Sequence, residues 1–120
     1  YPTQVTQDFV QSDMAPVLQI GRMDVPPEVE DEWNQWYSGM FVPDFEKVPG
    51  CVRGRRFRIV RGEPRYAVVY EFEHENVSQR PEWEAARDSR PQSVAMRGHI
   101  THAPGSPGVY RKIAQFYSPR

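Results

Sequence analysis

The chain has 120 residues, of which 26% are charged, with a formal net charge of −1 and a pI near 6.3. This length suits one domain with a modest core, and the near balance of charge argues against general nucleic-acid binding. Cys51 is the only cysteine, so an internal disulfide is excluded and a reducing cytoplasm is the expected compartment. Because no apolar run approaches the length of a membrane span, we expect no membrane partner.

The predicted elements begin with an N-terminal arm over residues 1–15 and a strand over residues 16–23. The arm is polar, with scattered apolar residues, and we expect it to be ordered only where it packs on the domain or on a partner subunit. Residues 16–120 are expected to form a single domain. In the strand, alternation separates Leu18, Ile20 and Arg22 from Val17, Gln19, Gly21 and Met23.

The segment 27–41 is predicted to form an amphipathic helix with an aromatic face. A pair of prolines suits its start, because residues of the first turn need no N–H donor, and the acidic residues that follow lie at the positive end of the helix dipole. Pro43 disfavours the helical conformation of Val42, so we expect the helix to end near Phe41. The apolar face recurs with helical spacing at Val29, Trp33, Trp36, Tyr37, Met40 and Phe41.

A β-hairpin is predicted from two strands over residues 52–61 and 66–73. Apolar and polar side chains alternate in both strands, and the sequence Arg-Gly-Glu-Pro between them is typical of a turn. One face of the first strand holds Arg55, and the other face holds Arg56. One face of the second strand consists of Tyr66, Val68, Tyr70 and Phe72.

The remaining elements complete a recognisable order. We expect helical segments over residues 81–86 and 93–97, a loop over residues 102–108 and a closing strand over residues 109–117. The order β-α-β-β-α-β is the ferredoxin-like arrangement, an α+β fold whose four-stranded antiparallel sheet carries helices on one face only. Since the strands are rich in apolar residues on both sides, we expect a second subunit to cover the other face in a homodimer.

Three stretches of the sequence together resemble the EthD-like branch of the dimeric α+β barrel superfamily. They are PPEVEDEWNQWYSGMFVPDFEKVPG, RRFRIVRGEPRYAVVYEFE and VYRKIAQFYSP. The most specific pieces are Trp36-Tyr37, Val48-Pro49-Gly50, Arg55-Arg56 and Pro64-Arg65-Tyr66. The resemblance implies a homodimer whose sheets close into a shared barrel, with a pocket between the sheet and helices of each subunit. It also implies action on aromatic or polyketide-like compounds without a cofactor.

One position departs from the pattern of that family. Its members often carry a histidine one helical turn after the Tyr of the Trp-Tyr pair, and this sequence has Phe41 there. The general base that the resemblance implies is therefore missing from the helix. Either another residue transfers the proton, or the pocket only binds its ligand, or it shapes a reactive ligand without acid–base help.

Three residues are candidates for catalysis. Tyr37 shares a helix face with Phe41 and can donate a hydrogen bond to a substrate carbonyl or act as a general acid, unless it is only a core tyrosine. His99 is the residue we expect to replace the missing base, because imidazole transfers protons near neutral pH. Asp44 is either a carboxylate base at the pocket mouth or an ordinary turn residue. His102 is expected at the surface, and no metal site is predicted.

The other candidates are predicted to contact the substrate. Asn34 borders the aromatic face and can orient a ligand carbonyl, or else it is a solvated helix residue. An arginine in an apolar pocket would anchor a carboxylate or phenolate. Its alternative is an ion pair with Glu71 or Glu73 of the neighbouring strand. We assign substrate contacts to Trp33, Asn34, Trp36, Phe41, Arg55, Tyr66 and Tyr70.

These observations favour a cofactor-independent enzyme that performs acid–base chemistry on an aromatic or polyketide-like molecule, as a lyase, dehydratase, cyclase or isomerase. A non-catalytic binding or accessory protein and a cofactor-free monooxygenase remain the alternatives. The strand over residues 66–73 lacks the Gly-rich aromatic signature of RNA-binding sheets, so no nucleic-acid partner is predicted. The expected partners are a small-molecule substrate and a second copy of the chain.

Overall fold

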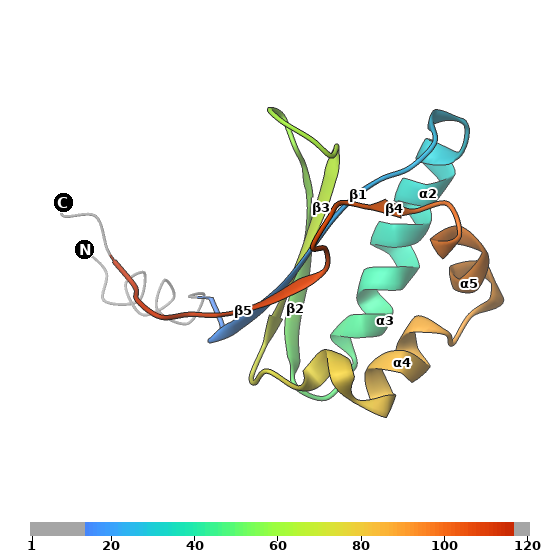
Figure 1. Ribbon diagram of the computed structural model, residues 1–120. Coiled ribbons are helices and arrows are strands. Elements are labelled where there is room, and N and C mark those ends of the chain that lie inside the picture. Colours follow the sequence, from blue (N-terminus) through green and yellow to red (C-terminus); the bar gives the residue numbers. More distant parts are fainter. Residues whose placement is uncertain (1–13, 117–120) are drawn as a thin grey trace, which may run out of the picture.

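The computed structural model of the protein describes residues 14–116 and shows an antiparallel sheet with helices packed on one face (Figure 1). The strands run in the order β2-β3-β1-β4, and β5 also pairs with β1. The sheet is made of β1 (Val17–Asp24), β2 (Cys51–Arg58), β3 (Tyr66–Phe72), β4 (Thr101–His102) and β5 (Gly108–Arg111). This is the predicted ferredoxin-like α+β arrangement, which is thereby confirmed.

The helical layer comes from two stretches of chain, one between β1 and β2 and the other between β3 and β4. It begins with a short 3₁₀ turn (Pro27–Val29) and includes a second one (Val77–Gln79). Its longer elements are α2 (Glu30–Trp36), the π-helical turn η2 (Tyr37–Phe41), α3 (Val42–Glu46), α4 (Pro81–Arg87) and α5 (Pro91–Arg97). α4 and α5 each begin with a proline, which suits a first helical turn because no N–H donor is needed there.

The first helix continues beyond Phe41, so the predicted end of the helix was wrong. Val42 has helical backbone angles, and its N–H donates to the carbonyl of Tyr37, five residues earlier. In a regular α-helix the ring of Pro43 would clash with the carbonyl four residues before it. The wider π-helical turn changes this spacing, so the chain continues directly into α3.

The apolar stripe of this helix is buried as predicted. Trp33, Trp36, Tyr37 and Phe41 are all at most 5% exposed, and Val29 and Met40 are partly buried against them. Phe45 and Val48, beyond the predicted helix end, extend the same core. The continuous helix therefore contributes more to the core than the predicted one would.

Burial along the strands shows which sheet face the helices cover. In β1 the buried positions are Val17, Gln19, Gly21 and Met23. These residues pair with Phe72, Tyr70, Val68 and Tyr66 of β3, and paired residues share a face. Across β2, Arg55 pairs with Val69 and therefore lies on the open face, whereas Arg56 pairs with Val68 and points toward the helices. The structure thus settles which arginine faces which side.

The closing strand differs from the prediction because two short strands replace one long one. β4 pairs with the end of β1 through Met23 and His102, within the segment predicted to be a loop. β5 ends at Arg111, which pairs with Val17, the first residue of β1. Just beyond that point the N–H of Lys112 donates to the carbonyl of Pro16. The strand is therefore shorter than predicted because β1 offers no further partner, and Tyr117 lies outside the described residues.

Most of the predicted N-terminal arm lies outside the described residues. The part that is described ends at Ala15, whose N–H donates to the carboxylate of Glu71 at 2.8 Å. None of the helices within residues 14–116 combines the length and the apolar character that crossing a membrane requires.

Candidate active site

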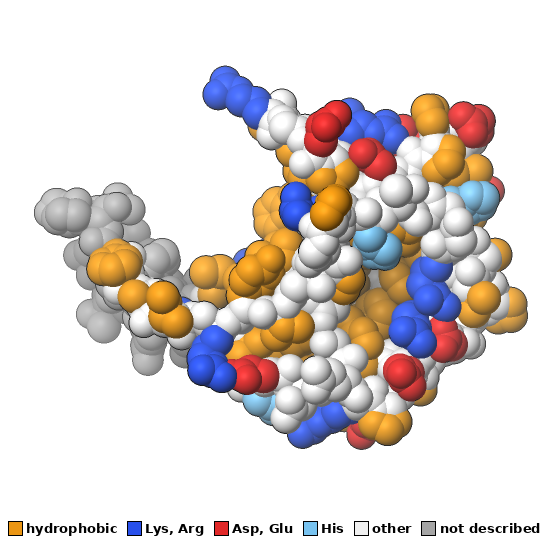
Figure 2. Space-filling model, in the orientation of Figure 1, with side chains coloured by type: hydrophobic (Ala, Val, Ile, Leu, Met, Phe, Trp, Pro, Cys, Tyr) orange, Lys and Arg blue, Asp and Glu red, His pale blue; other side chains and the backbone are white. Residues whose placement is uncertain are grey.

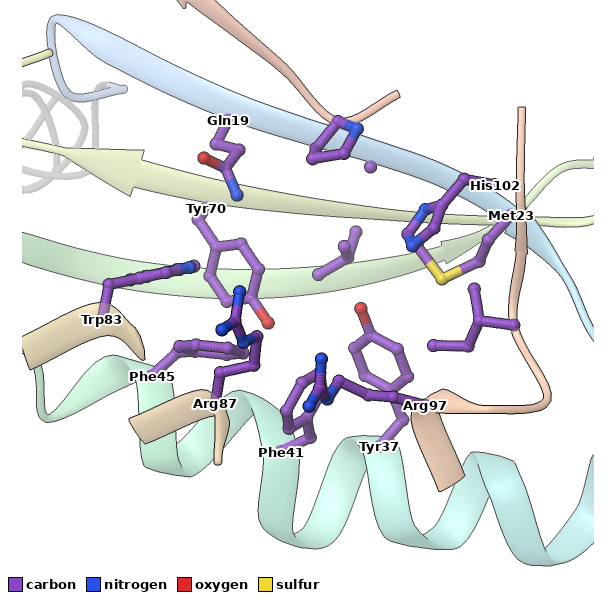
Figure 3. A pocket seen from close by; sticks show the side chains of 14 residues that line it. Gln19, Met23, Tyr37, Phe41, Phe45, Tyr70, Trp83, Arg87, Arg97 and His102 are labelled. Atoms are coloured by element: carbon purple, nitrogen blue, oxygen red, sulfur yellow. The ribbon is translucent and has the colours of Figure 1, made fainter. Parts of the chain in front are cut away.

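A pocket of about 290 Å³ lies between the sheet and the helical layer (Figure 3). This volume is at the lower end of the range for small-molecule sites. The lining residues come from β1, η2, α3, β3, α4, α5, β4 and the loops beside them. They are Gln19, Gly21, Met23, Tyr37, Phe41, Phe45, Val68, Tyr70, Trp83, Arg87, Arg97, Ile100, His102 and Pro107. Segments far apart in the sequence therefore meet at one cavity.

Aromatic rings form much of the pocket wall. Phe45 stacks on Trp83 with ring centroids 4.0 Å apart, and Tyr37 meets Phe41 edge-to-face at 5.2 Å. Tyr70 contacts both Phe45 and Trp83 in edge-to-face geometry. Rings in these arrangements hold one another in place and offer flat apolar surfaces to a ligand. The pocket therefore suits a flat aromatic molecule.

Two phenols bring hydroxyl groups into this apolar space. The hydroxyls of Tyr37 and Tyr70 both point into the pocket (Figure 3). Burial raises the pKa of each phenol above its ordinary value of 10, and for Tyr37 the nearby Arg56 guanidinium partly opposes this increase. The Tyr70 hydroxyl interacts with that of Tyr37, but it forms no hydrogen bond of regular geometry with a described residue. Both phenols therefore stay protonated at neutral pH and can donate to a ligand oxygen.

The charged groups of the pocket are basic. Arg87 from α4 and Arg97 from α5 reach it from the helical side, and His102 reaches it from β4 (Figure 3). None of the described lining residues is Asp or Glu. Figure 2 shows a hollow with hydrophobic side chains at its base, and basic, histidine and acidic side chains at its rim. An anionic ligand is therefore favoured over a cationic one.

His102 is the pocket residue with acid–base character near neutral pH. It pairs with Met23 of β1, and this pairing turns its side chain toward the helical face of the sheet. Partial burial lowers its pKa below the ordinary value of 6.5, because the charged imidazolium loses hydration. At neutral pH the ring is therefore unprotonated and can accept a proton.

Three of the predicted site residues line the pocket, namely Tyr37, Phe41 and Tyr70. Trp33 and Trp36 lie behind them in the core, at 0% and 2% exposure. Their rings contact the ring of Tyr37 at 5.2 and 5.3 Å, and the indole of Trp36 donates to Ser93 at 2.9 Å. The two tryptophans therefore support the pocket wall, and the prediction that they contact substrate is corrected.

Asn34 and Tyr66 belong to a separate group of polar residues, which we call the polar network. Asn34 donates to the Tyr66 hydroxyl at 3.0 Å and accepts from Arg56 at 2.8 Å. The Tyr66 hydroxyl in turn donates to Glu30. The guanidinium of Arg56 lies 4.4 Å from the centre of the Tyr37 ring, behind the pocket wall. These residues hold Tyr37 from outside and do not line the pocket.

The structure moves three further predicted residues away from the pocket. His99 is exposed at the end of α5, before β4 begins. Asp44 accepts two hydrogen bonds from Arg90, at 2.7 and 3.1 Å. Arg55 lies on the open sheet face and forms an ion pair with Glu71 at 3.4 Å, the alternative that the sequence allowed. The predicted pocket positions of these residues are therefore corrected.

Sequence analysis missed the basic residues of the pocket. Arg87 follows Trp83 by four residues and so shares its helix face, a spacing that could have indicated its position. Arg97 follows the buried Ser93 by the same spacing. His102 was expected at the surface and is exposed, but the pairing of β4 with β1 also turns its side chain toward the helices. The sequence carried no signal for that pairing.

The other reactive groups in the described part of the chain are less suited to chemistry. Cys51 is half-buried, and desolvation raises the pKa of its thiol to about 12, so it stays protonated. Within residues 14–116 no group of three or more His, Cys, Asp or Glu side chains is placed to hold a metal ion. The candidate chemistry therefore rests on the two phenols, the imidazole and the two guanidinium groups.

Comparison with solved structures relates the whole domain to known proteins. SnoaB from Streptomyces nogalater, a cofactor-independent oxygenase, aligns with a TM-score of 0.56 and 18% identity over 87% of this chain and 97% of its own. The heme-degrading protein MhuD from Mycobacterium tuberculosis aligns with a TM-score of 0.53 and 22% identity over 85% and 100% of the two chains. An EthD family protein from Bacillus halodurans aligns with a TM-score of 0.51 and 18% identity over 81% and 99%.

Sequence comparison adds no closer relative. No protein-family model matches the chain, and no curated protein matches it in sequence. The structural neighbours include an EthD family protein, as the resemblance implied, and all three belong to the dimeric α+β barrel superfamily. This chain therefore has the ferredoxin-like fold of the dimeric α+β barrel proteins.

Proposed function

We propose that this protein is an enzyme that acts on a small hydroxylated aromatic or polyketide-like molecule, and that His102 removes a proton from the substrate. The observation that carries the proposal is the placement of an uncharged imidazole in an aromatic pocket beside two protonated phenols. A base works best when its pKa lies near or below the working pH, and burial brings His102 into that range. This residue takes the role that we predicted for His99.

The phenols complete the proposed reaction. Removing a proton next to a carbonyl, or from a phenol, places negative charge on a substrate oxygen. Tyr37 and Tyr70 stay protonated at neutral pH, so each can donate a hydrogen bond to that oxygen as its charge develops. The Tyr70 hydroxyl interacts with that of Tyr37, so the two phenols can meet the same substrate oxygen. The phenols stabilise the anion, and His102 holds the proton.

The deprotonated substrate then has two fates. In an isomerase, cyclase, dehydratase or lyase, the proton returns to another atom of the substrate or to a leaving group. In an oxygenase, the electron-rich substrate reacts with O₂, so that a CH₂ group becomes a carbonyl and the second oxygen atom leaves as water. The likeness to SnoaB, a cofactor-independent oxygenase, favours the oxygenase as the second candidate function. Both routes begin with the same proton transfer.

The test uses tricyclic aromatic ketones with an acidic CH₂ group, followed by product analysis and by O₂ uptake. The variant His102→Asn keeps a polar side chain of similar shape but removes the base, so turnover should fall by about 10²- to 10⁴-fold. The matched control His99→Asn alters a histidine that does not line the pocket and should keep full turnover. Full activity in His102→Asn would disprove the assigned base. Tight binding with no turnover by the wild type would favour the accessory-protein alternative.

We further propose that the open face of the sheet pairs with a second copy of the chain. Phe57 and Tyr110 lie on this face and are 50% and 52% exposed. Leu18, Ile20 and Val69 lie beside them and are partly buried. Exposed apolar residues gathered on one sheet face are typical of an interface between subunits. This proposal extends the dimer predicted from the sequence.

Light scattering in solution tests the dimer. The wild type should have twice the 14.0 kDa mass of one chain. Phe57→Glu places a charge on the open face and should shift the protein toward monomer. Val60→Glu is the control, because Val60 is 89% exposed in the turn after β2 and lies outside the sheet. A monomeric wild type would disprove the proposal.

A further inference from the structure

We infer that the pocket takes an aromatic acid, whose carboxylate binds between the guanidinium groups of Arg87 and Arg97. The inference rests on the proposed function, since it names the class of molecule that the same pocket would bind. Arg87 lies in the last turn of α4, and Arg97 lies in the last turn of α5. Both side chains reach the pocket, with their guanidinium groups directed into it (Figure 3). Two separate helices therefore place cations at one site.

The acids near these two arginines do not line the pocket. Arg87 and Arg97 share one ion-pair partner, Asp88, with contacts of 3.2 and 2.6 Å to the same carboxylate oxygen. Glu84 also lies near Arg87. Neither acid is among the pocket-lining residues, so the ionised side chains that line the pocket are the two arginines. A ligand carboxylate would place a negative charge directly against them.

One N–H group at this site lacks an acceptor. The Nε of Arg97 is buried and forms no hydrogen bond with any described group. A buried donor without an acceptor is unfavourable, and a ligand oxygen would relieve it. A guanidinium offers its N–H groups in a planar fork that matches the two oxygens of a carboxylate. The unsatisfied donor therefore points to a ligand with an anionic oxygen.

A neighbouring arginine shows what a fully paired one looks like. Arg90, between α4 and α5, binds Asp44 through two hydrogen bonds of 2.7 and 3.1 Å. It has a carboxylate of its own and is not among the pocket-lining residues. Arg87 also donates two hydrogen bonds to Asp88, both of 3.2 Å, but it shares this acid with Arg97, and both of these arginines face the cavity. Arg90 is therefore a natural control.

The rest of the pocket specifies what the carboxylate is attached to. Phe45 and Trp83 present stacked rings next to Arg87, and Phe41 and Tyr37 lie next to Arg97 (Figure 3). An aliphatic acid would leave these flat surfaces poorly filled. A molecule with an aromatic ring and a carboxylate contacts both parts of the lining at once. The structure thus favours aromatic acids over neutral aromatic compounds and over simple aliphatic acids.

Titration calorimetry with two probes of the same shape tests the inference. 2-Naphthoate carries the carboxylate, and 2-naphthamide replaces it with a neutral amide. We expect the wild type to bind 2-naphthoate at least about tenfold more tightly, as typical charge-assisted hydrogen bonds allow. Arg87→Gln and Arg97→Gln should each reduce this preference to less than about threefold. Arg90→Gln should preserve it.

Two further variants keep the result independent of folding. Arg97→Lys retains the positive charge, so it should keep part of the preference for 2-naphthoate. It tests the same position if Arg97→Gln does not fold. Asp88→Asn removes the competing acid and should strengthen 2-naphthoate binding while leaving 2-naphthamide binding unchanged. Equal affinity of the wild type for both probes would overturn the inference. A preference that survives in both glutamine variants would overturn it as well.

The proposed function can fail separately. His102→Asn should lose turnover and still prefer 2-naphthoate, because the base and the arginines are different groups. If the protein shows no turnover but still prefers 2-naphthoate, the carboxylate site is supported and the proposed reaction is disproved. If it turns over neutral ketones but shows no preference between the two probes, the reaction is supported and the carboxylate site is disproved. Failure of both probes to bind would contradict the pocket itself, and with it both proposals.

Discussion

The polar network and the pocket lie on opposite sides of the Tyr37 ring and treat their polar groups differently. In the network, Arg56 donates to Asn34 and Ser38 at 2.8 and 2.9 Å, and Tyr66 both accepts from Asn34 and donates to Glu30. Arg65 extends the network to Asp24 and Glu30, with both contacts at 2.8 Å. Each of these polar side chains has a partner.

The pocket leaves polar groups without partners. Neither the Tyr70 hydroxyl, which interacts with that of Tyr37, nor the Nε of Arg97 forms a hydrogen bond of regular geometry with a described residue. The Nε1 of Trp33 shares this property, but Trp33 is fully buried and does not line the pocket. Since buried polar groups in folded proteins are nearly always paired, unpaired groups around a cavity indicate a ligand. The pairing in the network favours a role in stability, and the unpaired groups of the pocket agree with the binding role that we propose for it.

The largest expected effect comes from removing Arg56. Arg56→Met leaves Asn34 and Ser38 without their donor and removes a cation from beside the Trp33 and Tyr37 rings. The free energy of unfolding should fall by about 2–3 kcal/mol, measured by urea denaturation. Arg61→Met, in the exposed turn after β2, should change it by less than about 0.5 kcal/mol. Equal effects of the two variants would mean that the network contributes nothing special.

Substitution of two glycines compares the packing around Gly54 with the packing at the pocket wall around Gly21. A Cβ at Gly54 would lie 2.8 Å from the Tyr70 ring and 2.9 Å from Val42, so Gly54→Ala should reduce the unfolding free energy by about 1–3 kcal/mol. A Cβ at Gly21, on the pocket wall, would meet Met23 and Val68 no closer than 3.2 Å. Gly21→Ala should cause a smaller loss of stability and should weaken 2-naphthoate binding. The reverse order of stabilities would show that the pocket is the tighter region.

Removing one hydroxyl from each region should give different results. Tyr66→Phe deletes a hydroxyl that has two partners and should lower the unfolding free energy by about 1 kcal/mol. Tyr70→Phe deletes a hydroxyl that interacts with the Tyr37 hydroxyl but forms no hydrogen bond of regular geometry, so stability should fall less than in Tyr66→Phe. Turnover should decrease only in Tyr70→Phe. Thermal melts combined with activity assays measure both, and a stability loss in Tyr70→Phe as large as that in Tyr66→Phe would contradict the distinction.

The smallest effect concerns pH. His102 acts as a base only when it is unprotonated, and burial lowers its pKa below 6.5. The value of kcat/KM should therefore rise with pH, with a midpoint below 6.5, and stay level above pH 7. His99→Asn should leave this profile unchanged, because His99 lies away from the pocket. A midpoint above 6.5 in the wild type would contradict a desolvated His102 as the base.

Local patterns were sufficient to predict most elements of the fold. The aromatic stripe from Trp33 to Phe41 and the alternation in the hairpin strands depend on neighbouring residues only, and the structure confirms both. The predicted end of the first helix was wrong. Pro43 was expected to stop the helix, but a π-helical turn accommodates it and keeps Phe45 in the core. The long closing strand was wrong because strand length depends on the partner strand.

The pocket residues also divide into those that local spacing predicts and those that depend on tertiary structure. Tyr37, Phe41 and Tyr70 were predicted correctly as lining, because helix and strand periodicity places them on the buried face. Trp33 and Trp36 share that periodicity, but they pack behind the lining, and no local rule distinguishes these depths. Only the pairing of β4 with β1 shows that His102, and not His99, lines the pocket.

The sequence by itself determined the order of strands and helices, the buried face of each and the aromatic character of the core, because these follow from residue spacing along a short stretch of chain. Only the tertiary structure decided that Arg87, Arg97 and His102 meet at one cavity and that Arg55 faces away from it. Those positions depend on strand pairing and on the placement of α4 and α5, which join residues distant in the sequence.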